Sequence, residues 1–175
     1  PLPVQGVLLG LVLTAAVYDF RFRRIPNWVS VLGLVAGLGL NLGLGGWAGL
    51  RMAAGGFGLA FGIYLLLYLI RAMGAGDVKL MGAAGSLVGA GEWLKLFVAA
   101  ALVGGVLAAV MILARGRLRR TLWNIGFILS ELMRFRAPYL RREELDVKNS
   151  KAATLPHGVA IALGTLIYLA ILWRG

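Results

Sequence analysis

The sequence predicts an all-α membrane protein, a bundle of about six transmembrane helices with one further helix in the membrane interface. Its composition is the first reason: 60% of the 175 residues are hydrophobic and the mean hydropathy is +0.85. A soluble domain of this size could not hide that much apolar surface from water. The second reason is that the apolar residues form runs close to the roughly 20 residues that a spanning helix needs. Few residues remain for a soluble domain, so residues 1–175 are interpreted as a single membrane domain.

The apolar runs are separated by short polar or glycine-rich breaks. The expected spans cover residues 2–18, 27–44, 51–70, 77–89, 93–114 and 155–173. Pro26 suits the first turn of the second span, where its missing N–H costs nothing. Residues 45–47 (Gly-Gly-Trp) are expected to form a short turn, and glycines precede the short fourth span. The first run lacks a preceding basic region, so it is interpreted as a span and not as a cleaved signal.

The segment at about 115–152 differs from the rest because it is basic and polar. Within it, residues 122–133 are apolar but short, and they are expected to lie as a helix in the inner interface. With the N-terminus outside, all but three of the 18 Lys and Arg residues then fall on the inner side, as the positive-inside rule requires. The alternative is that 122–133 also spans, which would give seven spans and move six basic residues outside.

The net charge of +11 does not indicate nucleic-acid binding here, because the basic residues cluster at the ends of apolar runs. Cysteine is absent, which excludes disulfides and cysteine zinc sites. Pairs of glycines four residues apart, as at 33 and 37, 58 and 62, and 85 and 89, predict close packing of helices within the chain. The oligomeric state is not indicated.

The candidate catalytic residues are found among only seven acidic residues. Four lie in or beside the 115–152 segment and are interpreted as a solvated face, and Glu92 is expected to pair with Lys95. Asp19 and Asp77 remain, both at membrane boundaries on the expected cytoplasmic side. Acidic residues beside a span are costly and are candidates for function.

Two neighbouring carboxylates can share a proton, so that one activates water while the other polarises a carbonyl group. Structural roles are the alternative: Asp77 as the N-cap of a helix, and Asp19 as an interfacial residue balanced by nearby arginines. The only histidine, His157, is interpreted as an interfacial or packing residue.

Two stretches resemble the active-site motifs of the type IV prepilin peptidase family. The first is Asp19 followed by Arg24-Ile25-Pro26-Asn27, and the second is Gly74-Ala75-Gly76-Asp77-Val78-Lys79-Leu80, which has the pattern GxGDxKL. The last span, with Leu-Pro-His-Gly at 155–158, also looks like the family's final span, although an aromatic residue is more usual at 157.

The resemblance implies a membrane aspartic endopeptidase that removes the basic leader of prepilins or pseudopilins, with Asp19 and Asp77 as the catalytic pair. Gly74, Gly76, Lys79, Arg24, Pro26 and Asn27 would be the supporting motif residues. It further implies a multi-pass protein of the inner (cytoplasmic) membrane, with the active site facing the cytoplasm. Prepilin and membrane lipid are the expected partners, and neither a cofactor nor a metal is expected.

The chain departs from the longer family members, which carry a cytoplasmic insertion after the first span that is associated with methylation. Here only residues 20–25 separate the first two spans, so no methyltransferase activity is expected. The short form looks like the peptidases of tight-adherence (Flp) pilus systems. Two alternatives remain: another GxGD intramembrane protease, although the Pro-Ala-Leu motif of presenilin-like enzymes is missing, or a small transporter or scaffold without enzymatic activity.

Overall fold

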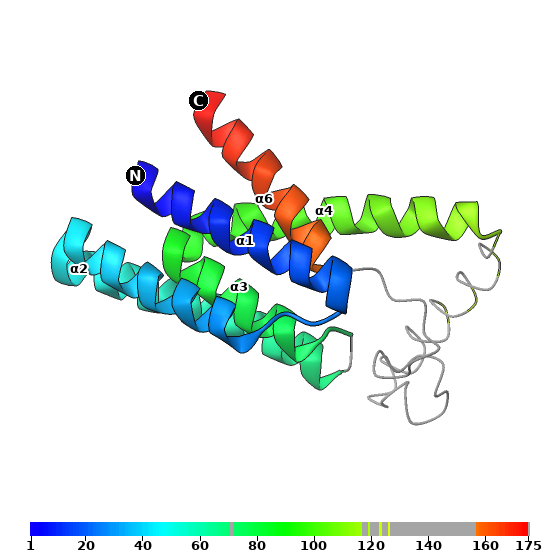
Figure 1. Cartoon of the computed structure of the whole chain (residues 1–175), viewed down its shortest axis with the longest axis horizontal. Helices are drawn as coiled ribbons and strands as arrows, with labels where there is room; N and C mark the ends of the chain where they lie inside the picture. The colour runs from blue at the N-terminus through cyan, green and yellow to red at the C-terminus, as the bar shows by residue number, and fades with distance from the viewer. Residues whose placement is uncertain (71, 117–118, 120–122, 124–125, 127–156, 175) are drawn as a thin grey trace.

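The computed structural model describes residues 1–70, 72–116, 119, 123, 126 and 157–174, and this part of the chain contains helices and no strand (Figure 1). The helices are α1 (Leu2–Phe22), α2 (Asn27–Leu69), α3 (Ala75–Val88), α4 (Ala90–Ala114) and α6 (His157–Arg174). The expected all-α class is therefore confirmed. The interfacial helix expected at 122–133, and most of the basic segment at 115–152, lie outside the described residues.

Helix α2 contains a reversal at Gly46, whose φ of 57° and ψ of −143° are not helical. The positive φ is readily adopted by glycine, which has no Cβ. The first half of α2 runs in the same direction as α3 and the second half runs against it. The contacts that show this are Gly33 with Ala83, Gly37 with Ser86, Gly56 with Gly85, and Met52 with Gly89. The turn expected at 45–47 is thus where the chain folds back (Figure 1).

The expectation of six spans is confirmed in part: the described residues form five helices, of which α2 consists of two antiparallel halves that meet at Gly46. The expected spans 27–44 and 51–70 correspond to these two halves, which are joined at Gly46. Helix α3 has only 14 residues, fewer than the roughly 20 that cross a bilayer. Four helices, α1, α2, α4 and α6, are long and apolar enough to cross a membrane.

Helix α3 is the centre of the bundle, and ten of its 14 residues are buried. The two halves of α2 pack closely along it, with backbone contact between Gly56 and Gly85. The side chain of Asn41 links the first half of α2 to the end of α3, because its Nδ2 donates hydrogen bonds of 3.0 Å to the carbonyl oxygens of Ser86 and Leu87. Small residues allow this close approach of helices in lipid. The packing predicted from the glycine pairs is confirmed at 33, 37, 85 and 89, but Gly58 and Gly62 face open space.

The outer surface of the bundle is apolar, as expected for a protein in lipid. Large hydrophobic side chains such as Val35 and Leu102 are more than 60% exposed, at 62% and 66%. A solvent-facing surface of this kind would be unusually apolar. The protein is therefore a multi-pass membrane protein.

Candidate active site

Asp19 lies in the last turn of α1, where it is half-buried and contacts the start of α6. The backbone N–H of Gly158 donates a hydrogen bond of 2.7 Å to Asp19 Oδ2. A Cβ added at Gly158 would lie 2.9 Å from Asp19 Cβ and 3.0 Å from Oδ2, so no side chain fits between these two residues. The first turn of a helix offers unpaired N–H groups and a positive dipole end. The start of α6 therefore holds the Asp19 carboxylate in place.

Asp77 lies in the first turn of α3 and is buried, with 8% of its surface exposed. Its Oδ2 accepts a hydrogen bond of 3.3 Å from the backbone N–H of Gly74, the residue that precedes α3. Asp77 is thus the third residue of the helix and not its N-cap, but its side chain caps the helix through the backbone N–H of the N-cap residue Gly74. Burial of a carboxyl group at a bundle end, with only one backbone donor, is more than helix capping requires.

The structure brings the two aspartates to the same end of the bundle. Asp77 interacts electrostatically with Asp19, with His157 at the start of α6, and with Tyr64 in the second half of α2. Figure 1 shows the end of α1 beside the start of α6, with the start of α3 at the same end of the bundle. The two carboxyl groups, which come from separate helices, are thus near enough to influence each other electrostatically.

The supporting motif residues also meet at this end. The Nζ of Lys79 donates a hydrogen bond of 2.9 Å to Oδ1 of Asn27, which joins the two motif stretches directly. A Cβ added at Gly76 would lie 3.2 Å from the Cβ of Ile25, so the start of α3 packs tightly against the connection between α1 and α2. Pro26 ends this connection immediately before α2, and Arg24 is exposed within it.

Three residues near the aspartates were not singled out as site residues from the sequence. Gly158 belongs to the predicted last span, the sequence predicts an interfacial or packing role for His157, and Tyr64 lies in an unbroken apolar run. Tyr64 is buried and its ring contacts the rings of Trp93 and Phe97, at centroid distances of 6.2 and 5.9 Å. The sequence could have indicated Tyr64 only through its hydroxyl group, which lies within an apolar span. A buried Tyr O–H usually has a polar partner, so such a residue is a candidate neighbour of a polar site.

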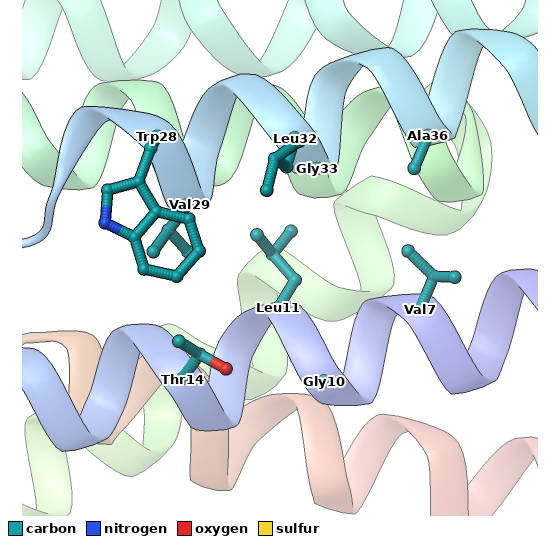
Figure 2. Close-up of a pocket in the computed structure, with 9 residues that line it drawn as sticks. All are labelled: Val7, Gly10, Leu11, Thr14, Trp28, Val29, Leu32, Gly33 and Ala36. Atoms are coloured by element: carbon teal, nitrogen blue, oxygen red, sulfur yellow. The ribbon is translucent and has the colours of Figure 1, made fainter.

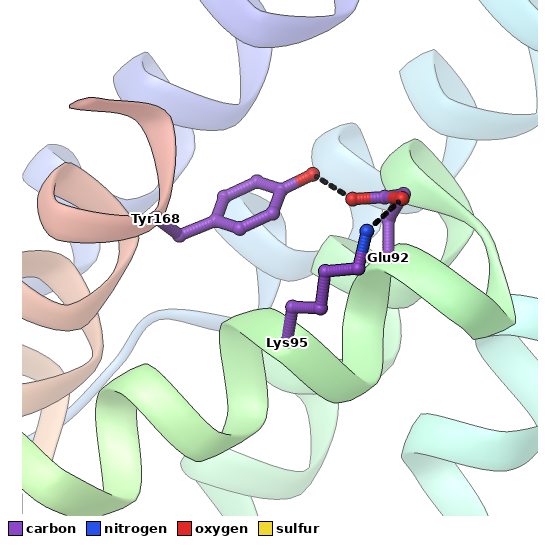
Figure 3. Close-up of polar contacts among 3 residues, drawn as sticks. All are labelled: Glu92, Lys95 and Tyr168. Atoms are coloured by element: carbon purple, nitrogen blue, oxygen red, sulfur yellow. Dashed lines mark hydrogen bonds and ion pairs between the residues drawn. The ribbon is translucent and has the colours of Figure 1, made fainter. Parts of the chain in front are cut away.

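The remaining described acidic residue, Glu92, lies at the opposite end of the bundle. It pairs with Lys95 at 2.7 Å, as predicted, and accepts a hydrogen bond of 3.1 Å from the Tyr168 hydroxyl (Figure 3). Tyr168 follows His157 by three turns of α6, about 16 Å along the helix axis. Glu92 is therefore a structural residue that ties α4 to α6, away from the aspartates.

Comparison with known proteins gives one match. A sequence model described as the type IV leader peptidase family matches residues 6–109, more than half of the chain, and this range includes Asp19 and Asp77. No curated protein and no solved structure matched.

Proposed function

Because the chain belongs to the type IV leader peptidase family, we propose that it is an aspartic endopeptidase in which Asp19 and Asp77 are the catalytic pair. The observation that carries this proposal is the placement of these two carboxyl groups, which are 58 positions apart in the sequence, at the same end of the bundle on the end of α1 and the start of α3 (Figure 1). Close carboxyl groups of this kind favour a state with one proton between them. That state supplies both a general base and a general acid.

The proposed reaction is hydrolysis of a peptide bond without a covalent intermediate. The ionised carboxylate takes a proton from a water molecule, whose oxygen attacks the carbonyl carbon. The protonated carboxyl group meanwhile donates a hydrogen bond to the carbonyl oxygen and later returns a proton to the leaving amine. The N–H of Gly158 fixes Asp19 and the N–H of Gly74 fixes Asp77, so that both carboxyl groups are oriented before substrate arrives.

The proposed substrate is a prepilin or pseudopilin with a short basic leader, a glycine at the cleavage site and a following apolar helix. The apolar helix would lie in the membrane and the leader would remain in the cytoplasm, beside the end of the bundle that carries the aspartates. The proposed location is the inner membrane with the N-terminus outside. The distribution of Lys and Arg along the chain supports this orientation.

The proposal is tested by co-expressing a prepilin with this protein and measuring the mass of the prepilin. The expected result is loss of the leader, with a new N-terminus directly after the glycine, only when the protein is present. A small transporter or scaffold would leave the prepilin intact. Methylation of the new N-terminus is not expected, and it would appear in the same spectrum as an added methyl group.

A further inference from the structure

A groove runs between α1 and the first half of α2, and its lining is almost entirely apolar (Figure 2). Its volume is about 310 Å³, which lies within the roughly 300–1,000 Å³ of ordinary ligand sites. Val7 and Leu11 point into it from α1, and Leu32 and Ala36 from α2. Gly10 has no side chain, and a Cβ added there would meet nothing within 4 Å. The α1 side of the groove is therefore open at this position.

The groove leads toward the candidate active site. At that end it is lined by Thr14 and Trp28. The Trp28 ring contacts the ring of Tyr18, the neighbour of Asp19, at a centroid distance of 6.1 Å. Trp28 also follows Asn27, which binds Lys79. Thr14 precedes Asp19 by five residues, about 7.5 Å along the helix axis.

We propose that this groove binds the first two turns of the substrate's apolar helix, on the side of the scissile bond that follows the leader. The inference rests on the proposed function and adds to it the surface that recognises the substrate. From Thr14 to Val7 the groove extends about 10 Å along α1, which is the length of two helical turns. A helix entering it from the aspartates would place its first apolar side chains beside Thr14 and Trp28.

The absence of a side chain at Gly10 favours a helix as the molecule that binds in the groove. Helices associate in lipid through close approach at small residues, because lipid offers no hydrophobic driving force between them. Gly10 and Ala36 provide such positions on facing walls. Gly33 is different, since Leu11 already packs against it within the protein. A lipid acyl chain is the other candidate occupant, and the experiments below separate the two.

Cross-linking provides the first test, because the chain has no cysteine of its own. Gly10→Cys is compared with Gly58→Cys in the second half of α2 and Gly105→Cys in α4, two exposed glycines away from the groove with open space around them. The probe is a synthetic peptide with a basic leader, a glycine and an apolar helix of about 20 residues, carrying one cysteine in its second turn. All three variants also carry Asp77→Asn, so that the probe stays whole during mild oxidation.

The expected result is at least about tenfold more disulfide with Gly10→Cys than with either control, which corresponds to preferential occupancy of the groove. Equal cross-linking at the three positions, or none at Gly10→Cys, would overturn the inference. The protein without substitutions is tested on the same probe in parallel. If the probe is cleaved but not cross-linked, the groove is not the binding site of the substrate helix, and the proposed function still holds. If the probe is not cleaved, both the proposed function and this inference are rejected.

Filling the groove provides the second test. Gly10→Leu places a large side chain where the substrate helix would lie, and Gly58→Leu adds the same side chain in the second half of α2, away from the groove. We expect kcat/KM for the probe to fall about tenfold in Gly10→Leu, mainly through KM, as for loss of a binding contact. Equal kcat/KM in the two variants would mean that the substrate helix does not use the groove and would contradict the proposal.

Discussion

Asp19 and Gly158 are 139 residues apart, yet the N–H of Gly158 donates a hydrogen bond of 2.7 Å to the Asp19 carboxylate. The last described helix therefore orients a carboxyl group of the first one. Gly158 is the position where this arrangement is most sensitive, since an added Cβ would lie within 3.3 Å of three Asp19 atoms.

Gly158→Ala is expected to reduce cleavage of a prepilin about 10²-fold, because a displacement of about 1 Å at a catalytic group can cost that much. The loss should appear in kcat, while KM and the thermal unfolding temperature stay near their original values. Gly105→Ala is the matched control, since a Cβ at Gly105 meets nothing within 4 Å. Equal activity in the two variants would show that Asp19 does not depend on this contact.

Lys79 and Asn27 are expected to act as a pair, because their side chains are joined by one hydrogen bond between the two motif stretches. Lys79→Met and Asn27→Ala should lower activity by similar factors, and the double variant should lose no more than the more damaging single change. The coupling energy from this cycle is expected to be about 0.5 kcal/mol or more. Strictly additive losses in peptidase assays would mean that the two residues act separately.

Gly85 is expected to be essential for stability, because the backbones of Gly85 and Gly56 are in contact. Gly85→Val should lower the free energy of unfolding by about 1–3 kcal/mol, as overpacking does in other cores. Thermal unfolding in detergent micelles measures the change. Gly58→Val is the control, since it places the same β-branched side chain in a helix with open space around it, and a similar loss there would argue against the packing described.

Tyr168→Phe is expected to leave peptidase activity within about twofold, because the Glu92 cluster lies about 16 Å along α6 from the aspartates. The lost hydrogen bond to Glu92 should lower the free energy of unfolding by about 0.5–1.5 kcal/mol. Activity and unfolding temperature are measured on the same preparation. A large loss of activity without loss of stability would mean that this end of the bundle takes part in the reaction.

The fold could be predicted from the sequence where it depends on apolar length and on glycine. The expected ranges of the first, fifth and last spans lie within four residues of the ends of α1, α4 and α6, because polarity changes abruptly there. The turn at Gly46 was also expected. The packing of both halves of α2 along α3 could not be anticipated, since a pattern of hydrophobicity does not reveal which helices are neighbours.

The two aspartates of the candidate site could be predicted from the sequence, but their neighbours could not. Asp19 and Asp77 stood out because acidic residues are so few in an apolar chain. Gly158 and Tyr64 did not, because their contacts depend on which helices are neighbours, and lipid-facing and buried faces of these helices are equally apolar. The link between Lys79 and Asn27 was likewise not predicted, since it requires α3 to begin beside the start of α2.

The most direct test of the account is the rate of prepilin cleavage by Asp19→Asn, Asp77→Asn and the double variant, measured by mass spectrometry under single-turnover conditions. If the two carboxyl groups work as one unit, each single change should reduce the rate at least about 10³-fold, and the double change should reduce it no further. Unchanged thermal unfolding would show that the variants remain folded. A single variant that retained a tenth or more of the original rate would contradict the proposal that Asp19 and Asp77 share the reaction.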